Sequence, residues 1–147
     1  MRPFLLLVAL VWGLALGQGL VRGVTPEEVE GLLREMGVVY EKRDHHLFLL
    51  ELASPKVWLE LDWCEEGRCG LVALSAGFRK KVDLEHLNAW NRDYRFSRAY
   101  LDREGDPWVE WELDLTGGVS WEALREFLRL FAEAVLPKFM EHIGFEP

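Results

Sequence analysis

Hydrophobic side chains recur with a helical period in three parts of the chain. Thr25 is suited to cap the first helix, Pro26 fits its first turn, and Glu28 completes a capping box. Asp83 and Ser120 stand where they can cap the second and third helices. The side chains expected on one face of each helix are Val29, Leu32, Leu33 and Met36, then Leu84, Leu87, Asn88, Asn91 and Tyr94, then Leu124, Phe127, Leu128, Phe131 and Val135. Pro137 is expected to stop or kink the third helix.

Between these helices, hydrophobic and polar side chains alternate with the period of two that is typical of strands. Strands are expected at 38–41, 46–52, 56–63, 70–78, 96–102 and 108–115. In two of them the inward positions are Val57, Leu59, Leu61 and Trp63, and Val109, Trp111, Leu113 and Leu115. The outward positions are Trp58, Glu60 and Asp62, and Trp108, Glu110, Glu112 and Asp114. The order α-β-β-β-β-α-β-β-α, with strands arriving as hairpins, predicts an α+β domain with helices packed on an antiparallel sheet.

Length and charge limit the function classes. The chain has 147 residues and a formal net charge of -8. This length fits one domain, which we assign to residues 24–147. Nucleic acids and anionic membranes favour surfaces rich in lysine and arginine, so neither is expected as the main partner.

The first 17 residues have the layout of a secretory signal peptide. A basic start at Arg2 precedes an uncharged apolar run from Phe4 to Leu16, and small residues at Ala15 and Gly17 suit cleavage. The alternative is an uncleaved membrane anchor. The sequence thus predicts export to the periplasm or the exterior, with no membrane attachment after cleavage.

Cys64 and Cys69 flank a four-residue turn between two expected strands. Opposed positions in a hairpin bring side chains close enough to bridge, and exported proteins keep disulfides. We expect a structural disulfide, with free thiols as the alternative. A zinc site would need two more ligands, which the neighbouring sequence does not offer in a matched pair, so no metal or cofactor is expected.

Several other residue types have both a structural and a functional interpretation. The outward carboxylates are most simply a solvated strand face, and no catalytic residue is assigned among them. Trp58 and Trp108 either form an exposed aromatic strip for a partner or are covered by a terminal helix. Asn88 and Asn91 either form a polar recognition site beside Trp90 or satisfy backbone groups of the next connection.

The sequence LNAWNR at 87–92 begins a run of motifs that resembles the YbjN family. The motifs that follow it are RFSRAYLD at 95–102, GDP at 105–107 and GGVS at 117–120. The resemblance extends from about Thr25 to Phe139, and the family's paired cysteines are matched by Cys64 and Cys69. YbjN proteins are labelled sensory transduction regulators, and their fold is similar to type III secretion chaperones, which bind other proteins and often dimerise. The resemblance implies no catalytic residues.

These observations predict a non-catalytic, exported domain with a regulatory or chaperone-like role in the bacterial envelope. Its expected partner is an unidentified protein, or a second copy of the chain in a homodimer. The alternative is a small envelope enzyme or small-ligand binder that uses a pocket near Trp90, Asn88 and Asn91.

Overall fold

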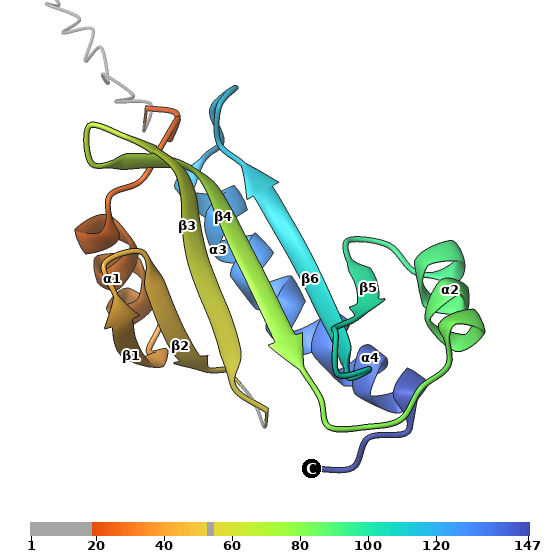
Figure 1. Ribbon diagram of the computed structural model, residues 1–147. Coiled ribbons are helices and arrows are strands. Elements are labelled where there is room, and N and C mark those ends of the chain that lie inside the picture. Colours follow the sequence, from red (N-terminus) through yellow and green to blue (C-terminus); the bar gives the residue numbers. More distant parts are fainter. Residues whose placement is uncertain (1–18, 53–54) are drawn as a thin grey trace, which may run out of the picture.

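The computed structural model describes residues 19–52 and 55–147, whose arrangement is shown in Figure 1. The signal peptide predicted at residues 1–17 lies outside the described residues. Within the described part of the chain, no helix combines the length and the hydrophobicity needed to cross a membrane.

Helices and strands form an α+β fold, and the predicted fold class is confirmed. In chain order they are α1 (Pro26–Glu35), β1 (Val39–Asp44), β2 (Leu47–Glu51), β3 (Val57–Glu65), β4 (Arg68–Gly77), α2 (Leu84–Asp93), β5 (Arg98–Leu101), β6 (Pro107–Asp114), α3 (Trp121–Leu130), the π-helical turn η1 (Phe131–Val135) and α4 (Leu136–Ile143).

The strands make one antiparallel sheet of six strands in the order β1-β2-β3-β4-β6-β5. After β4 the chain leaves the sheet through α2 and returns at the far edge as β5 (Figure 1). The β5–β6 hairpin then places β6 beside β4, in register from Leu71–Asp114 to Gly77–Trp108. Because every strand is antiparallel to its neighbours, one face of the sheet can pack on helices while the other faces solvent.

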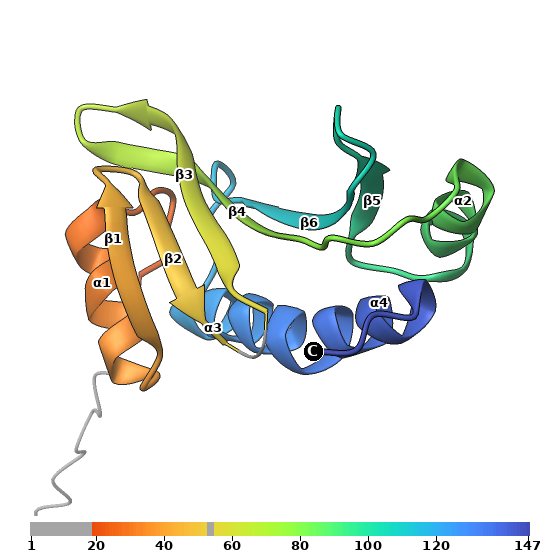
Figure 2. The same cartoon turned by 60° about the horizontal axis from the view of Figure 1, so that its bottom comes forward.

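The helices α1, α3 and α4 lie on the same face of the sheet, and α2 lies at its end beside β5 (Figure 2). The core lies between these helices and the sheet. Its largest fully buried side chains are Trp90, Phe48, Phe131, Phe139, Leu33, Leu50, Leu59, Leu74, Leu115, Leu124, Leu128 and Leu136.

Each of the three predicted helix caps is present. Thr25 Oγ1 accepts a hydrogen bond from the backbone N–H of Glu28, which is one half of the predicted capping box, whereas the carboxylate of Glu28 accepts from Arg68. Asp83 accepts from the N–H of His86, and Ser120 accepts from that of Ala123. These bonds satisfy N–H groups that have no partner within the helix, so they fix where each helix begins.

Pro137 does not end the last helix. The π-helical turn η1 comes immediately before α4, and Pro137 lies in the first turn of α4. Proline has no N–H to donate and its ring crowds the preceding turn, so a widened turn before it lets the helix continue. As a result α3, η1 and α4 together pass along the sheet (Figure 2).

The prediction that Trp63 faces the core is wrong. Val57, Leu59 and Leu61 are buried as expected, but Trp63 has a positive φ of 54° and its side chain is 57% exposed. A residue in that conformation cannot continue the pleat of a strand, so the alternation of side chains is interrupted there.

The turn predicted between the two cysteines is shorter than expected. The strands continue to Glu65 and from Arg68, which pair across the hairpin, so only Glu66 and Gly67 form the loop. Both have positive φ, at 51° and 80°, as a two-residue hairpin turn requires.

Candidate binding surface

The face of the sheet opposite α1, α3 and α4 is not covered by any helix that the structure describes (Figures 1 and 2). Its side chains come from the outward positions of β2, β3, β4, β6 and β5. The strand register aligns them in rows across the sheet, of which one is Leu49, Trp58, Ser75, Glu110 and Arg98, and the next is Leu47, Glu60, Ala73 and Glu112. We call this face the open face.

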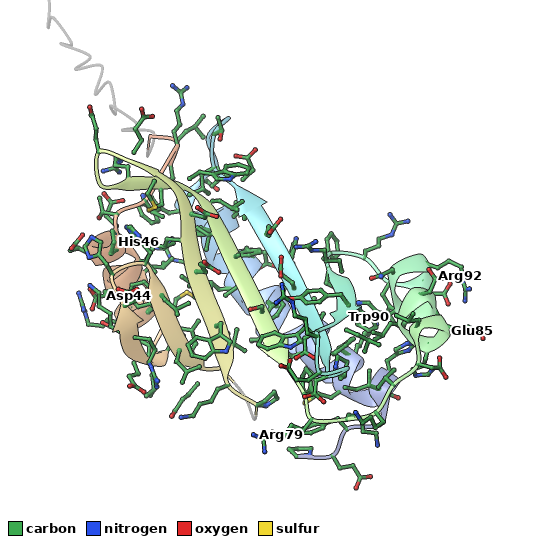
Figure 3. The ribbon with its side chains drawn as sticks, viewed as in Figure 1. Asp44, His46, Arg79, Glu85, Trp90 and Arg92 are labelled. Atoms are coloured by element: carbon green, nitrogen blue, oxygen red, sulfur yellow. A yellow bond between two sulfur atoms is a disulfide. The ribbon has the colours of Figure 1, made fainter. Side chains whose placement is uncertain are left out.

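Trp58 and Trp108 lie on the open face and are both partly exposed. They line a small hollow of about 220 Å³ with Gly77 and Asp102, and Arg79 lies at its edge just after β4 (Figure 3). Since the terminal helices pack on the opposite face, the interpretation in which one of them covers these indoles is wrong.

Five carboxylates also lie on the open face, and all but Glu110 are exposed: Glu60, Asp62, Glu110, Glu112 and Asp114. Arg98 Nη2 lies 2.6 Å from Glu110 Oε1 and 3.8 Å from Glu112 Oε1. Tyr100 donates its hydroxyl to Glu110 Oε2 at 3.2 Å. The surface is therefore acidic, with Arg98 as a partial counter-charge.

The pKa values of Glu110 and Glu112 are shifted in opposite directions. Partial burial alone would raise the pKa of Glu110, but hydrogen bonds from Arg98, Glu112 and Tyr100 hold that pKa below its ordinary value. The hydrogen bond to Glu110 and partial burial raise the pKa of Glu112. Two carboxyls with separated pKa values are an acid–base pair in some enzymes. Here they lie on an exposed strand face, where the shallow hollow beside them is also lined by Phe96, Ser97 and Trp111.

Trp90 is not part of a surface site. Its side chain is 1% exposed, and its Nε1 donates to Ser97 Oγ at 3.1 Å. Figure 3 shows Trp90 on the side of α2 that faces the rest of the domain, whereas Glu85 and Arg92 point away. The ring packs against Phe139 and Tyr94. The predicted role of Trp90 in a partner surface or ligand pocket is therefore wrong.

Asn91 has the structural role that the sequence left open. Its Nδ2 donates to the carbonyl of Ala99 at 3.1 Å, and its Oδ1 accepts from the N–H of Ala99 at 2.8 Å. The amide thus ties α2 to β5. Asn88 is exposed and lies with Asn91 beside a shallow hollow that is otherwise lined by Leu84, Leu87, Ala99, Tyr100 and Leu101.

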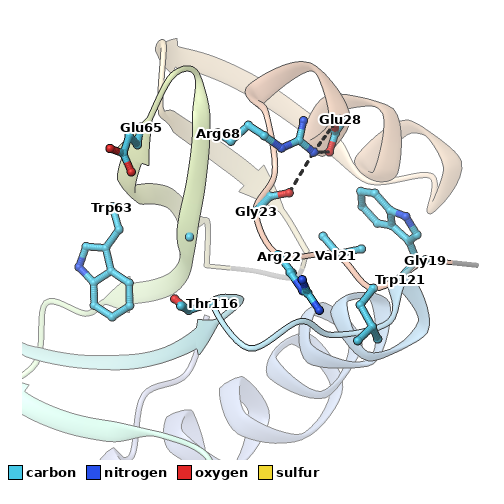
Figure 4. A pocket seen from close by; sticks show the side chains of 12 residues that line it. Gly19, Val21, Arg22, Gly23, Glu28, Trp63, Glu65, Arg68, Thr116 and Trp121 are labelled. Atoms are coloured by element: carbon cyan, nitrogen blue, oxygen red, sulfur yellow. Dashed lines mark hydrogen bonds and ion pairs between the residues drawn. The ribbon is translucent and has the colours of Figure 1, made fainter.

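A hollow of about 750 Å³ lies where the described part of the chain enters the domain (Figure 4). Trp63 and Trp121 stand on opposite sides of it. Arg68 Nη2 donates to the carbonyl of Gly23 at 3.2 Å and to Glu28 Oε1 at 2.9 Å, so its charge is already paired. The hollow is an open groove between the β3–β4 hairpin and the segment before α1.

Cys64 and Cys69 form a disulfide, as the hairpin spacing predicts. They are directly opposed on β3 and β4. Cys69 is fully buried, and the backbone of Val24, just before α1, pairs with it through two hydrogen bonds.

Sequence reasoning missed Asp102, which organises the β5–β6 turn. Its Oδ1 accepts from the N–H groups of Glu104 and Asp106, and its Oδ2 accepts from Trp108 Nε1 at 3.0 Å. An aspartate just before a Gly-Asp-Pro turn is the signal that could have revealed this role, since such side chains bond to the backbone of the turn.

Comparison with known proteins supplies one family match. The YbjN family, described as "Putative bacterial sensory transduction regulator", matches residues 25–141. None of the curated proteins with which the chain was compared matches it.

Proposed function

Because this chain belongs to the YbjN family, we propose that it is a non-catalytic regulatory domain of the bacterial envelope that acts by binding another protein. The family description supports regulation. The likeness of the family to secretion chaperones, which are small binding domains, favours the same mode of action. The observation on which the proposal rests is the open face, a broad sheet surface with two partly exposed indoles among carboxylates.

Charge indicates the chemistry of the partner. Glu60 and Glu112 face outward in the same row of the sheet, with Ala73 between them. A lysine- or arginine-rich segment would pair with these carboxylates and place apolar atoms against Trp58 and Trp108. A second copy docking through the same face would bring like charges together. A homodimer would therefore form through a different surface.

Export is the second part of the proposal. The predicted signal peptide at residues 1–17 and the disulfide between Cys64 and Cys69 both support it, because disulfides persist outside the reducing cytosol. Edman sequencing of the protein recovered from bacterial envelope fractions should begin at Gln18. Recovery of chains with Met1 intact from the cytosol would contradict export.

Charge reversal on the open face tests partner binding. Purified wild-type protein is used to capture partners from envelope extracts, beside Glu60→Lys/Glu112→Lys. The matched control is Glu141→Lys/Glu146→Lys, which makes the same charge change at exposed positions near the carboxyl end. We expect the wild type and the control to retain one basic protein and the open-face variant to lose it.

Retention of the same protein by all three chains would contradict the proposed surface. Circular dichroism of each chain separates loss of binding from loss of folding. Light scattering of the purified wild type tests the predicted homodimer independently of the partner.

The enzyme or small-ligand alternative loses the pocket on which it depended. Trp90 is buried in the core, and the hollow beside Asn88 and Asn91 is shallow and bordered mainly by apolar side chains. No specific observation in the described residues favours a reaction there, and the family description is that of a regulator.

A further inference from the structure

His46 lies beside the disulfide, a neighbour that the sequence does not reveal. A ring nitrogen of His46 and the sulfur atoms of Cys64 and Cys69 all lie within 4.8 Å of one another. The three residues come from the β1–β2 turn, β3 and β4. His46 is held along β3 because its carbonyl accepts a hydrogen bond from the N–H of Leu61 at 2.9 Å. Figure 3 labels His46 at the turn between β1 and β2.

We propose that Cys64, Cys69 and His46 bind a zinc ion when the disulfide is reduced. Two thiolates and an imidazole are donors that zinc prefers. His46 supplies one of the two further ligands that the cysteines need, and water would take the fourth position, as it does in zinc sites with three protein ligands. Zinc–ligand bonds of about 2.0–2.3 Å place tetrahedral ligand atoms roughly 3.5–3.8 Å apart. Reduction frees the two sulfur atoms to separate to that distance, and His46 needs to approach by only about 1 Å.

The chemistry balances with a dithiol as the reductant. The dithiol transfers two electrons and two protons to the disulfide, so that it becomes a disulfide itself and leaves two protein thiols. Zinc binding then displaces the two thiol protons to solvent. The disulfide and the zinc site use the same sulfur atoms, so the two states exclude each other.

Exposure and charge allow both steps. Cys64 is the exposed residue of the pair and Cys69 the buried one, so a reductant would attack the Cys64 sulfur and Cys69 would leave as the thiol. Glu65 and Glu66, which follow Cys64, are also exposed and favour a cation nearby. This inference rests on the cluster alone and does not depend on the proposed partner.

The test uses purified protein reduced with a water-soluble phosphine and kept free of oxygen. Titration with Co²⁺ should give a thiolate-to-cobalt charge-transfer band that saturates at one Co²⁺ per chain. Added Zn²⁺ should then remove this band. Competition with a chromophoric chelator gives the zinc affinity. His46→Ala should weaken that affinity at least about tenfold, because losing even a group that only hydrogen-bonds to a metal ligand costs that much. His45→Ala is the matched control, since His45 is an exposed histidine in the same turn.

Cys64→Ala/Cys69→Ala should abolish the cobalt band. The oxidised wild type should also show no cobalt band. An unchanged affinity in His46→Ala would overturn the three-residue site, and equal zinc binding by the reduced wild type and the double cysteine variant would overturn the site entirely. Circular dichroism of each reduced chain shows that the comparison is between folded proteins.

Discussion

Gly77 is required by the indole that lies on it. A Cβ placed at Gly77 would stand 2.4 Å from Trp108 Cε2, much closer than two carbon atoms can approach. Trp108 is held in that position by its hydrogen bond to Asp102. The absence of a side chain at one residue thus determines how an aromatic group on the open face is placed.

Gly77→Ala should lower the free energy of unfolding by about 1–3 kcal/mol, the usual cost of forcing extra atoms into a packed site. Urea denaturation measures it. Gly31→Ala is the control with the opposite sign, because Gly31 lies within α1 and nothing lies within 4 Å of its added Cβ. There we expect a gain of about 0.5–1 kcal/mol. A loss of stability in both variants would contradict the assigned contact.

Asp102 should contribute to the acid sensitivity of the fold. The hydrogen bond from Trp108, followed by those from backbone N–H groups of the turn, holds the pKa of Asp102 below its ordinary value of 3.8. A carboxyl with a lowered folded-state pKa adds stability above its unfolded pKa, and this stability is lost as pH falls through the folded-state pKa.

Asp102→Asn lacks this titration. Its melting temperature should therefore fall less steeply than that of the wild type as pH is lowered from about 5 to below the ordinary aspartate value of 3.8. Calorimetry at a series of pH values gives both slopes, and parallel curves would refute the assigned role.

At the scale of elements, the β3–β4 hairpin combines a two-residue turn with a disulfide. Its tip is fixed by Glu66, Gly67 and the bridge between Cys64 and Cys69. The chain-entropy model gives a modest value for so short a closed loop, because the unfolded chain loses little freedom.

Cys64→Ala/Cys69→Ala should therefore lower the free energy of unfolding by about 2 kcal/mol. The wild type in excess reductant, without added metal, should show the same loss by urea denaturation. A reduced wild type as stable as the oxidised protein would mean that the bridge does not constrain the unfolded chain.

The elements also show how far local patterns reach. The three helix starts were predictable because Thr25, Asp83 and Ser120 bond to N–H groups only three residues away. The exposure of Trp63 was not predictable, since its positive φ interrupts an otherwise regular alternation. The π-helical turn before Pro137 was not predictable either, because local rules treat a proline ring as a stop or a kink and do not show how the preceding turn widens to accommodate it.

At the scale of the whole molecule, the carboxyl-terminal helix completes the core. Phe139 is fully buried, and its ring centroid lies 5.5 Å from that of Phe78 and 5.1 Å from that of Trp90. One side chain of α4 thus joins the segment after β4 to α2.

Phe139→Ala should cost about 3–5 kcal/mol, the range for removing a large buried aromatic side chain. Glu141→Ala, an exposed change on the same helix, should stay within about 0.5 kcal/mol of the wild type. Thermal and urea unfolding measure both. Equal stabilities would show that α4 is not part of the cooperative core.

The sequence by itself determined the helix starts, the strand alternation except at Trp63, the α+β class and the pairing of Cys64 with Cys69, because each depends on patterns of residues close together in the chain. Only the tertiary structure decided that Trp90 is buried, that the terminal helices leave Trp58 and Trp108 uncovered, and that His46 lies beside the disulfide. These facts depend on which elements pack together, and contacts between distant segments leave no periodic trace in the sequence.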